Sequence, residues 1–173
     1  FPGLNIVRTV PEDETKELKA LHKGNAYDLP TQFKKSVCWF LCSAAILRLR
    51  GHKKPISMLV HTTAMQRDHF NEYEILKNWL LYGRKSGEIL DLCESVYTVE
   101  KDEFTLEDLR NSYPKYGRIN EVNGEFPGFV DIKPEIEKLE IERKYVRFAN
   151  FGELHEPIGL EEWPVRQMIT ATV

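Results

Sequence analysis

The stretch Asp28–Gly51, with the sequence DLPTQFKKSVCWFLCSAAILRLRG, decides how this chain folds. Its apolar residues cover nearly every face of a helix, and a helix that is apolar all round is a buried one. Asp28 and Pro30 fit a helix start, and Gly51 fits the left-handed position that commonly ends a helix. The stretch therefore predicts a long central helix whose charges are kept to its two ends.

The next stretch, Ile56–His61 (ISMLVH), is short and almost continuously apolar. Such a run is typical of a buried strand and is compatible with a parallel one. Thr62 and Thr63 can cap a following helix, which the spacing of its apolar residues carries to about Tyr82. Helix, strand and capped helix together form one α/β unit.

The flanking regions give weaker signals. Pro11 and the acids after it open a helix that ends near Gly24, and Thr105–Asp108 resembles a capping box. The other expected elements are a strand over 4–10, helices over 86–96 and 134–142, a surface loop over 113–128, and strands over 144–148 and 167–173. We expect a single domain over 1–173, with a core over 7–82, a helical and loop insertion over 83–143, and a strand-containing tail over 144–173.

Composition limits the classes of function. The chain has 173 residues, of which 42% are hydrophobic, and a net charge of -3, so it can build a core but lacks the overall basic excess of a dedicated nucleic-acid binder. Three cysteines without framework spacing indicate reduced thiols and a cytoplasmic location. The most apolar run, Val37–Leu47, is shorter than the roughly 20 residues that span a bilayer, and we expect no membrane contact.

Two binding motifs are approximated but not met. A phosphate-binding loop has the form GxxxxGK[S/T], and in register with Lys85 the two glycines are replaced by Trp79 and Arg84. The string therefore predicts a basic turn between helices. Cys38 and Cys42 lie one helical turn apart without a second Cys or His pair nearby, so they predict core thiols and not a zinc site.

Two features could touch a ligand. His61 stands at the carboxyl end of the predicted strand, where open α/β sheets bind ligands, although a His hydrogen-bonded at a strand end gives the same pattern. The segment 48–54 (RLRGHKK) is the one dense basic cluster. Cations are stabilised at a helix C-terminus in any case, so a structural role suffices, and a role in contacting phosphates stays open.

A nuclease pattern is also present in outline. Asp131, followed by Glu142 and Lys144, imitates the acid and acid-x-Lys arrangement that holds a metal and orients water in one class of nucleases. That architecture uses a β-turn-β pair, whereas the intervening 134–140 segment is predicted to be helical. These residues are weak catalytic candidates.

The motifs of the central helix and strand resemble those of the Z1 (Z-one) domain. The resemblance rests on LPxxxKxxVxxFLxxAxxxRxRG over 29–51, then SMLVHT over 57–62 and Gln66, and it covers about 7–80. Domains of this family carry an endonuclease label and occur in bacterial proteins with a helicase-like ATPase, often in restriction or phage defence. Where the family has His-Asn before Ser-Met, this chain has Pro55 and Ile56. Neither the Walker loop nor the later segment with the ATPase arginines is found.

The resemblance implies a helix-rich α/β fold with a small, incomplete RecA-like sheet, as in the second lobe of a helicase. It implies no cofactor in this chain, with ATP and magnesium bound by the parent protein. DNA, the rest of the parent and a restriction or defence protein are the implied partners. Together with the basic cluster, it gives these candidate nucleic-acid contacts: Arg48, Arg50, Lys53, Lys54, His61, Thr62 and Gln66.

Three functions are compatible with these patterns. The leading hypothesis is a non-catalytic domain that engages nucleic acid for a helicase-like, ATP-dependent endonuclease. The alternatives are a metal-dependent nuclease that uses Asp131, Glu142 and Lys144, and a protein–protein interaction domain, suggested by the acidic pI of about 6.0 and the apolar central helix.

Overall fold

A computed structural model describes residues 9–60, 62, 66–103, 105–115, 126–139, 146–149 and 166–171, the last two strands and a few other positions by their backbone alone. The helices are α1 (Glu12–His22), α2 (Thr31–Leu49), α3 (Gln66–Ser86), α4 (Glu88–Glu103), α5 (Leu106–Ser112) and α7 (Phe129–Lys138). The strands are β1 (Ile56–Val60), β2 (Val146–Ala149) and β3 (Arg166–Ala171). The prediction of a helix-rich chain is confirmed.

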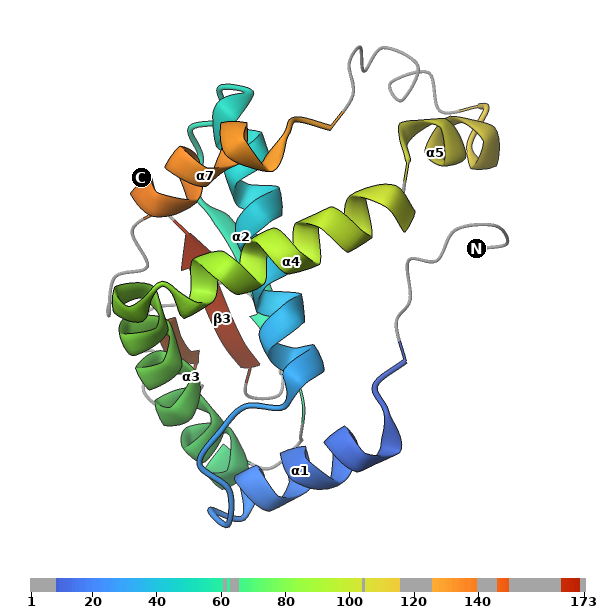
Figure 1. Ribbon diagram of the computed structural model, residues 1–173. Coiled ribbons are helices and arrows are strands. Elements are labelled where there is room, and N and C mark those ends of the chain that lie inside the picture. The colour runs from blue at the N-terminus through green and yellow to red at the C-terminus, as the bar shows by residue number, and fades with distance from the viewer. Residues whose placement is uncertain are drawn as a thin grey trace, which may run out of the picture.

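Helix α2 is the centre of the structure (Figure 1). Helices α4 and α7 both pack against it, while α3 packs against α1 and α4. Each large apolar side chain buried in this way contributes roughly 1.5–3 kcal/mol to stability. The predicted central helix is therefore confirmed, and its buried residues are Val37, Cys38, Leu41, Cys42, Ala44, Ala45 and Ile46.

Small side chains let α4 approach α2 closely. The thiols of Cys38 and Cys42 donate to the carbonyls of Ile89 and Cys93, at Sγ–O distances of 3.9 and 3.6 Å, and the Cys93 thiol donates back to the carbonyl of Cys38 at 3.7 Å. All three cysteines are free and buried, which confirms them as core residues. Hydrogen bonding to Cys93, together with burial, raises the pKa of the Cys38 thiol well above its usual range. Such thiols are inert core groups.

Glycines end the first two helices as the sequence predicts. Gly51 has φ of +82°, its N–H donates to the Arg48 carbonyl at 2.8 Å, and the next N–H, of His52, donates to the Leu47 carbonyl at 2.9 Å. This pair of bonds defines a Schellman motif. Gly24 closes α1 in the same way, with φ of +75°.

The predicted strand over 56–61 forms, but its parallel pairing is wrong. Strand β3 pairs antiparallel with both β1 and β2, in the order β1-β3-β2. Burial alternates along β1, and Leu59 is 50% exposed, so the apolar run does not have both of its faces covered as a buried parallel strand would. A RecA-like lobe is built on a parallel sheet, and the strands within the described residues do not show one.

Two helices, α7 and α4, begin or end at other residues than the sequence predicted. The helix expected over 134–142 begins earlier, at Phe129, because the Asp131 carboxylate accepts the Gly128 N–H at 3.0 Å and Pro134 is accommodated inside α7. Gly87, with φ of +86°, separates α3 from α4, which extends to Glu103. The expected strand over 4–10 and most of the loop over 113–128 lie outside the described residues.

The capping box predicted at Thr105 is confirmed. The Thr105 hydroxyl accepts the Asp108 N–H at 3.1 Å, and the Asp108 carboxylate accepts the Thr105 N–H at 3.2 Å. The Thr105 hydroxyl also donates to the Asp108 carboxylate at 2.5 Å, and this bond, together with the one from the Thr105 N–H, lowers the pKa of Asp108. The bonds together fix the start of α5. Across the part of the chain that the structure describes, no helix combines the length and apolarity needed to cross a bilayer.

Replacing Gly51 with Ala tests the left-handed turn after α2. A Cβ at this position would meet no atom within 4 Å, so the cost is one of backbone conformation and not of collision. We expect Gly51→Ala to lower the free energy of unfolding by roughly 1 kcal/mol, measured by urea denaturation. Gly51→Asn should lose less, because Asn tolerates this conformation better. Equal stability of Gly51→Ala and the parent chain would contradict the assigned turn.

Candidate functional site

The basic turn, defined as residues 48–54, projects from the C-terminal end of α2. The Schellman motif reverses the chain there, and the side chains of Arg50, His52, Lys53 and Lys54 are all exposed. Four basic side chains from five consecutive residues thus share one small surface. Such a surface can contact phosphates, because long cationic side chains on an exposed turn reach them without burying their own charge.

Arg48 differs from the other basic residues of the turn. It is half-buried, and its Nη1 donates to the carbonyl of His52 at 2.6 Å. This bond spans the turn and holds its two ends together. Of the two arginines predicted as nucleic-acid contacts, Arg48 therefore stabilises the turn, while Arg50 presents its charge at the surface.

Arg50 also lies within electrostatic reach of the contact between α4 and α7. The Tyr97 hydroxyl donates to the Pro127 carbonyl at 2.7 Å, and its ring lies 6.2 Å from that of Phe129, centroid to centroid. Burial raises the pKa of Tyr97 to about 12, and the positive charge of Arg50 partly opposes this rise. The turn is therefore supported by a packed junction of α2, α4 and α7.

The end of β1 carries a second polar cluster, formed by His22, Thr62 and Glu72. The Thr62 hydroxyl donates to the Glu72 carboxylate at 2.5 Å, and His22 Nε2 lies 3.1 Å from the same hydroxyl. His22 Nε2 also lies 3.5 Å from the Glu72 carboxylate. Thr62 was predicted as a cap for α3 and as a nucleic-acid contact, and in this structure its hydroxyl takes part in the cluster.

Glu72 is the most buried member of the cluster. It is 0% exposed, and burial raises its pKa from 4.5 to about 7, while the hydrogen bond from Thr62 acts to lower it. Asn71, its neighbour on α3, donates to the His22 carbonyl at 2.9 Å. The cluster therefore ties the end of α1 and the segment after β1 to α3. The sequence did not indicate it, because His22 and Glu72 carry no motif and are 50 residues apart.

Of the remaining predicted site residues, the structure describes some and leaves others outside the described ranges. His61, Glu142 and Lys144 lie outside the described residues, and Gln66 begins α3 with its side chain undescribed. Asp131 is exposed at the start of α7, where its carboxylate accepts the Gly128 N–H. Among the described ranges, no three His, Cys, Asp or Glu side chains are grouped so as to hold a metal ion. The nuclease site stays a prediction.

The string Gly83–Gly87 forms a helix junction. Ser86 Oγ donates to the Gly83 carbonyl at 3.2 Å and accepts the Glu88 N–H at 3.4 Å, which joins α3 to α4. Gly83–Ser86 are the last residues of α3, so the predicted turn is reduced to Gly87, which alone lies between the two helices with φ of +86°.

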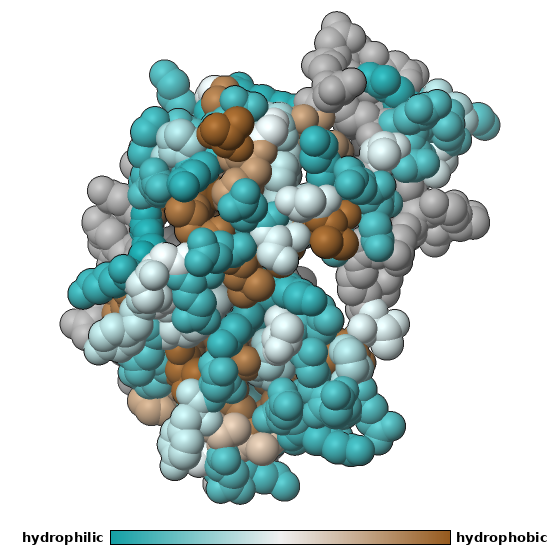
Figure 2. All heavy atoms as spheres, in the orientation of Figure 1, coloured by the Kyte–Doolittle hydropathy of each residue, from teal (hydrophilic) through white to brown (hydrophobic). Residues whose placement is uncertain are grey.

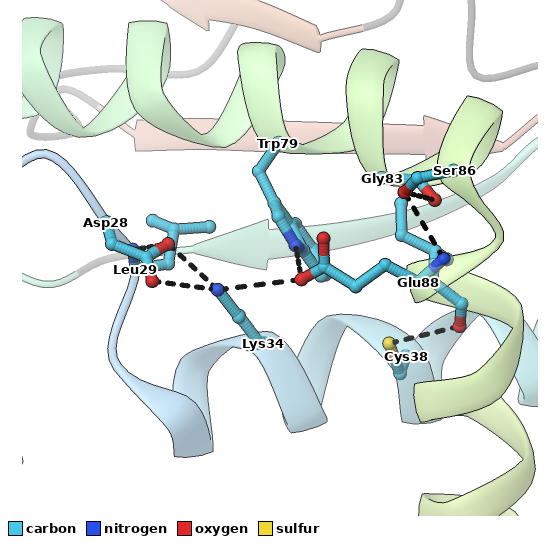
Figure 3. A network of polar contacts seen from close by, with 9 residues as sticks. Asp28, Leu29, Lys34, Cys38, Trp79, Gly83, Ser86 and Glu88 are labelled. Atoms are coloured by element: carbon cyan, nitrogen blue, oxygen red, sulfur yellow. Dashed lines mark hydrogen bonds and ion pairs between the residues drawn. The ribbon is translucent and has the colours of Figure 1, made fainter.

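Beside this junction lies a network that the sequence did not indicate (Figure 3). Lys34 lies 2.8 Å from Asp28 and 3.7 Å from Glu88, which accepts the Trp79 indole N–H at 3.0 Å. The Lys34 ammonium also lies 5.8 Å from the centroid of the Trp79 ring. Side chains of α2, α3 and α4 meet here and hold the start of α2 in place.

The raised pKa of Glu72 predicts a pH dependence of stability. A carboxyl group whose pKa is higher in the folded state stabilises the fold fully below the unfolded value and loses this contribution as pH rises through the folded value. We therefore expect the Glu72 contribution to fall between about pH 4.5 and pH 7, by on the order of 3 kcal/mol. Glu72→Gln should flatten this part of the stability profile, measured by urea denaturation at a series of pH values.

Thr62→Val serves as the opposing variant. It removes the hydrogen bond that lowers the pKa of Glu72, so the falling limb should move to higher pH. An unchanged profile in both variants would show that Glu72 does not titrate in this range.

Comparison with known proteins gives one match. A family model for the Z1 domain matches residues 32–150, which span α2, β1, α3, α4, α5, α7 and β2. No curated protein and no solved structure shows significant similarity to the chain. The match extends well beyond 29–66, where the motifs quoted from the sequence lie, and covers more than half of the chain. On this evidence the chain belongs to the Z1 domain family.

Proposed function

We propose that this domain engages nucleic acid through the basic turn and does so without catalysis of its own. It would act within a helicase-like, ATP-dependent endonuclease of restriction or phage-defence systems in the bacterial cytoplasm, the setting that its resemblance to the Z1 domain implied. The observation that carries the proposal is the exposure of Arg50, His52, Lys53 and Lys54 on one ordered turn.

Charge distribution supports the basic turn as the contact surface. The net charge of the chain is -3, so attraction to a polyanion requires local concentration of positive charge. The turn supplies this concentration, and its Schellman motif fixes the backbone from which the side chains extend. A fixed backbone lowers the entropy that binding must otherwise overcome.

The contacts expected from such a surface are with phosphates and not with bases. Lys and Arg side chains on a turn give affinity and orientation without reading sequence. The domain would hold the duplex or single strand for its parent, while sequence or structure preference would come from elsewhere. A RecA-like sheet is not needed for this role, and the proposal does not include one.

Neutralising three residues of the turn tests the proposal. We expect the chain to bind a fluorescein-labelled duplex with three or four phosphate contacts, so raising salt from about 50 to about 200 mM should weaken binding roughly 40- to 150-fold. Arg50→Ala with Lys53→Ala and Lys54→Ala should remove most of the affinity and most of the salt dependence, measured by fluorescence anisotropy. Arg48 is left unchanged because it holds the turn together.

A matched control is available on α1 and the residue that follows it. Lys16, Lys19 and Lys23 are exposed, and their triple replacement by Ala changes the net charge by the same amount. This control should bind DNA much as the parent chain does. If both triple variants lose affinity equally, the effect is one of overall charge and the basic turn is not the site.

A further inference from the structure

The sheet formed by β1, β3 and β2 has one face toward the core and one face away from it. Successive side chains along a strand lie on opposite faces. Val60 is buried in the core, and Met58 packs against the same core. Ser57 and Leu59 alternate with them and are exposed, with half of the Leu59 side chain open to solvent. The face that carries Ser57 and Leu59 is therefore the outer face of the sheet.

The helices lie on the other side of the sheet. Helices α3 and α4 are nearer to the viewer than β3 in Figure 1, and α3 contacts both β2 and β3. Figure 2 shows this helical side of the molecule, where hydrophilic residues cover most of the surface. The outer face is a separate surface, turned away from the helices.

The register of the strands determines which other residues belong to the outer face. Leu59 is opposite Met168 of β3, and Met168 is opposite Arg147 of β2. Residues opposite each other share a face, as do residues two apart along one strand. The strand positions that share the outer face with Leu59 are Ser57, Arg147, Ala149, Arg166, Met168 and Thr170.

These positions carry positive charge and no negative charge. Arg147 and Arg166 are the two charged residues among them, so the formal charge of the face is +2, although the net charge of the whole chain is -3. The two arginines stand diagonally across β2 and β3, which places them roughly 7–8 Å apart. Two neighbouring cations on an exposed sheet attract a polyanion.

The outer face follows directly on the basic turn. Lys53 and Lys54 are exposed, and only Pro55 separates them from β1. At about 3.3 Å per residue, Lys54 and Leu59 are roughly 17 Å apart along the strand. A nucleic-acid segment of a few nucleotides can therefore span the turn and the sheet.

We infer that the outer face binds single-stranded DNA as a continuation of the basic turn. This inference rests on the proposed function and adds the form of DNA that the domain holds. The phosphates would contact Arg147 and Arg166, and the bases would lie on Leu59. An apolar centre beside cationic residues fits a strand whose bases are unpaired. The bases of a duplex are stacked inside it and show only their edges in the grooves, so a flat sheet face cannot reach them in this way.

The experiment compares a fluorescein-labelled deoxythymidine strand of about 15 nucleotides with a labelled duplex of the same length, by fluorescence anisotropy. The unaltered chain should bind the single strand at least fivefold more tightly than the duplex. Arg147→Ala with Arg166→Ala should weaken binding of the single strand roughly tenfold. The same change should reduce the slope of log affinity against log salt by about 1.4, since each phosphate contact in a single strand contributes about 0.7.

Leu59→Gln tests the apolar part of the face. It should weaken binding of the single strand about threefold or more and leave binding of the duplex unchanged, because only unpaired bases can lie on this residue. Val130→Gln is the matched control, since Val130 is an exposed aliphatic residue of α7. It should change neither affinity.

Two further variants separate the arginines from overall charge and from folding. Lys16→Ala with Lys19→Ala removes the same charge from exposed residues of α1 and should leave binding of the single strand unchanged. Arg147→Lys with Arg166→Lys keeps the charge, and it should restore most of the affinity that the Ala variant loses.

The inference is overturned if the unaltered chain prefers the duplex, or if the Arg147 and Arg166 variant binds the single strand as tightly as the α1 control. In both cases the proposed function stands as long as the basic-turn variant still loses its affinity for DNA. If the unaltered chain binds neither form of DNA, the proposed function fails and the inference fails with it.

Discussion

The close approach of α4 to α2 is the constraint on which the rest of the structure depends. Cys38 and Cys42 place small thiols where larger side chains would hold the helices apart. Cys93 of α4 packs against them and donates its thiol to the Cys38 carbonyl. Thiols fit here because sulfur is compact, polarisable and a weak hydrogen-bond donor. With α4 in place, the rings of Trp39 and Tyr97 lie 6.1 Å apart, and α7 can pack against both helices.

This packing determines the position of the basic turn. Because α2 is held along its length, its C-terminal turn has a fixed origin, and the backbone of 48–54 is ordered by bonds to the last turn of the helix. Helix α4 crosses α2 and does not run alongside it (Figure 1). Residues of both helices line a cavity beside their contact. One packed interface thus determines the origin of the exposed cationic turn and contributes residues of α2 and α4 to the cavity wall.

A second constraint is the buried polar cluster at the end of β1. A carboxyl group with no exposure is costly unless it has polar partners. Thr62 donates a hydrogen bond to Glu72, and the His22 ring lies 3.5 Å from the same carboxylate. The cluster fixes the segment after β1 against α1 and α3, which are otherwise distant in the sequence. The Thr62 hydroxyl at the end of β1 is already bonded within this cluster, which gives Thr62 a structural role.

The sequence by itself determined the local structure. The all-round apolar pattern of α2, the glycines at 24 and 51, the core cysteines and the capping box at Thr105 could all be read from it, because each depends on a few neighbouring residues. The exposed basic turn was likewise visible as a dense run of charge. Only the tertiary structure decided the antiparallel pairing of β1, the role of Arg48 within the turn, the partnership of His22 with Glu72, and the cavity. Most of these features bring together residues that are far apart in the chain. The different roles of Arg48 and Arg50 belong to two neighbouring arginines that no sequence pattern distinguishes. A local pattern therefore cannot predict them.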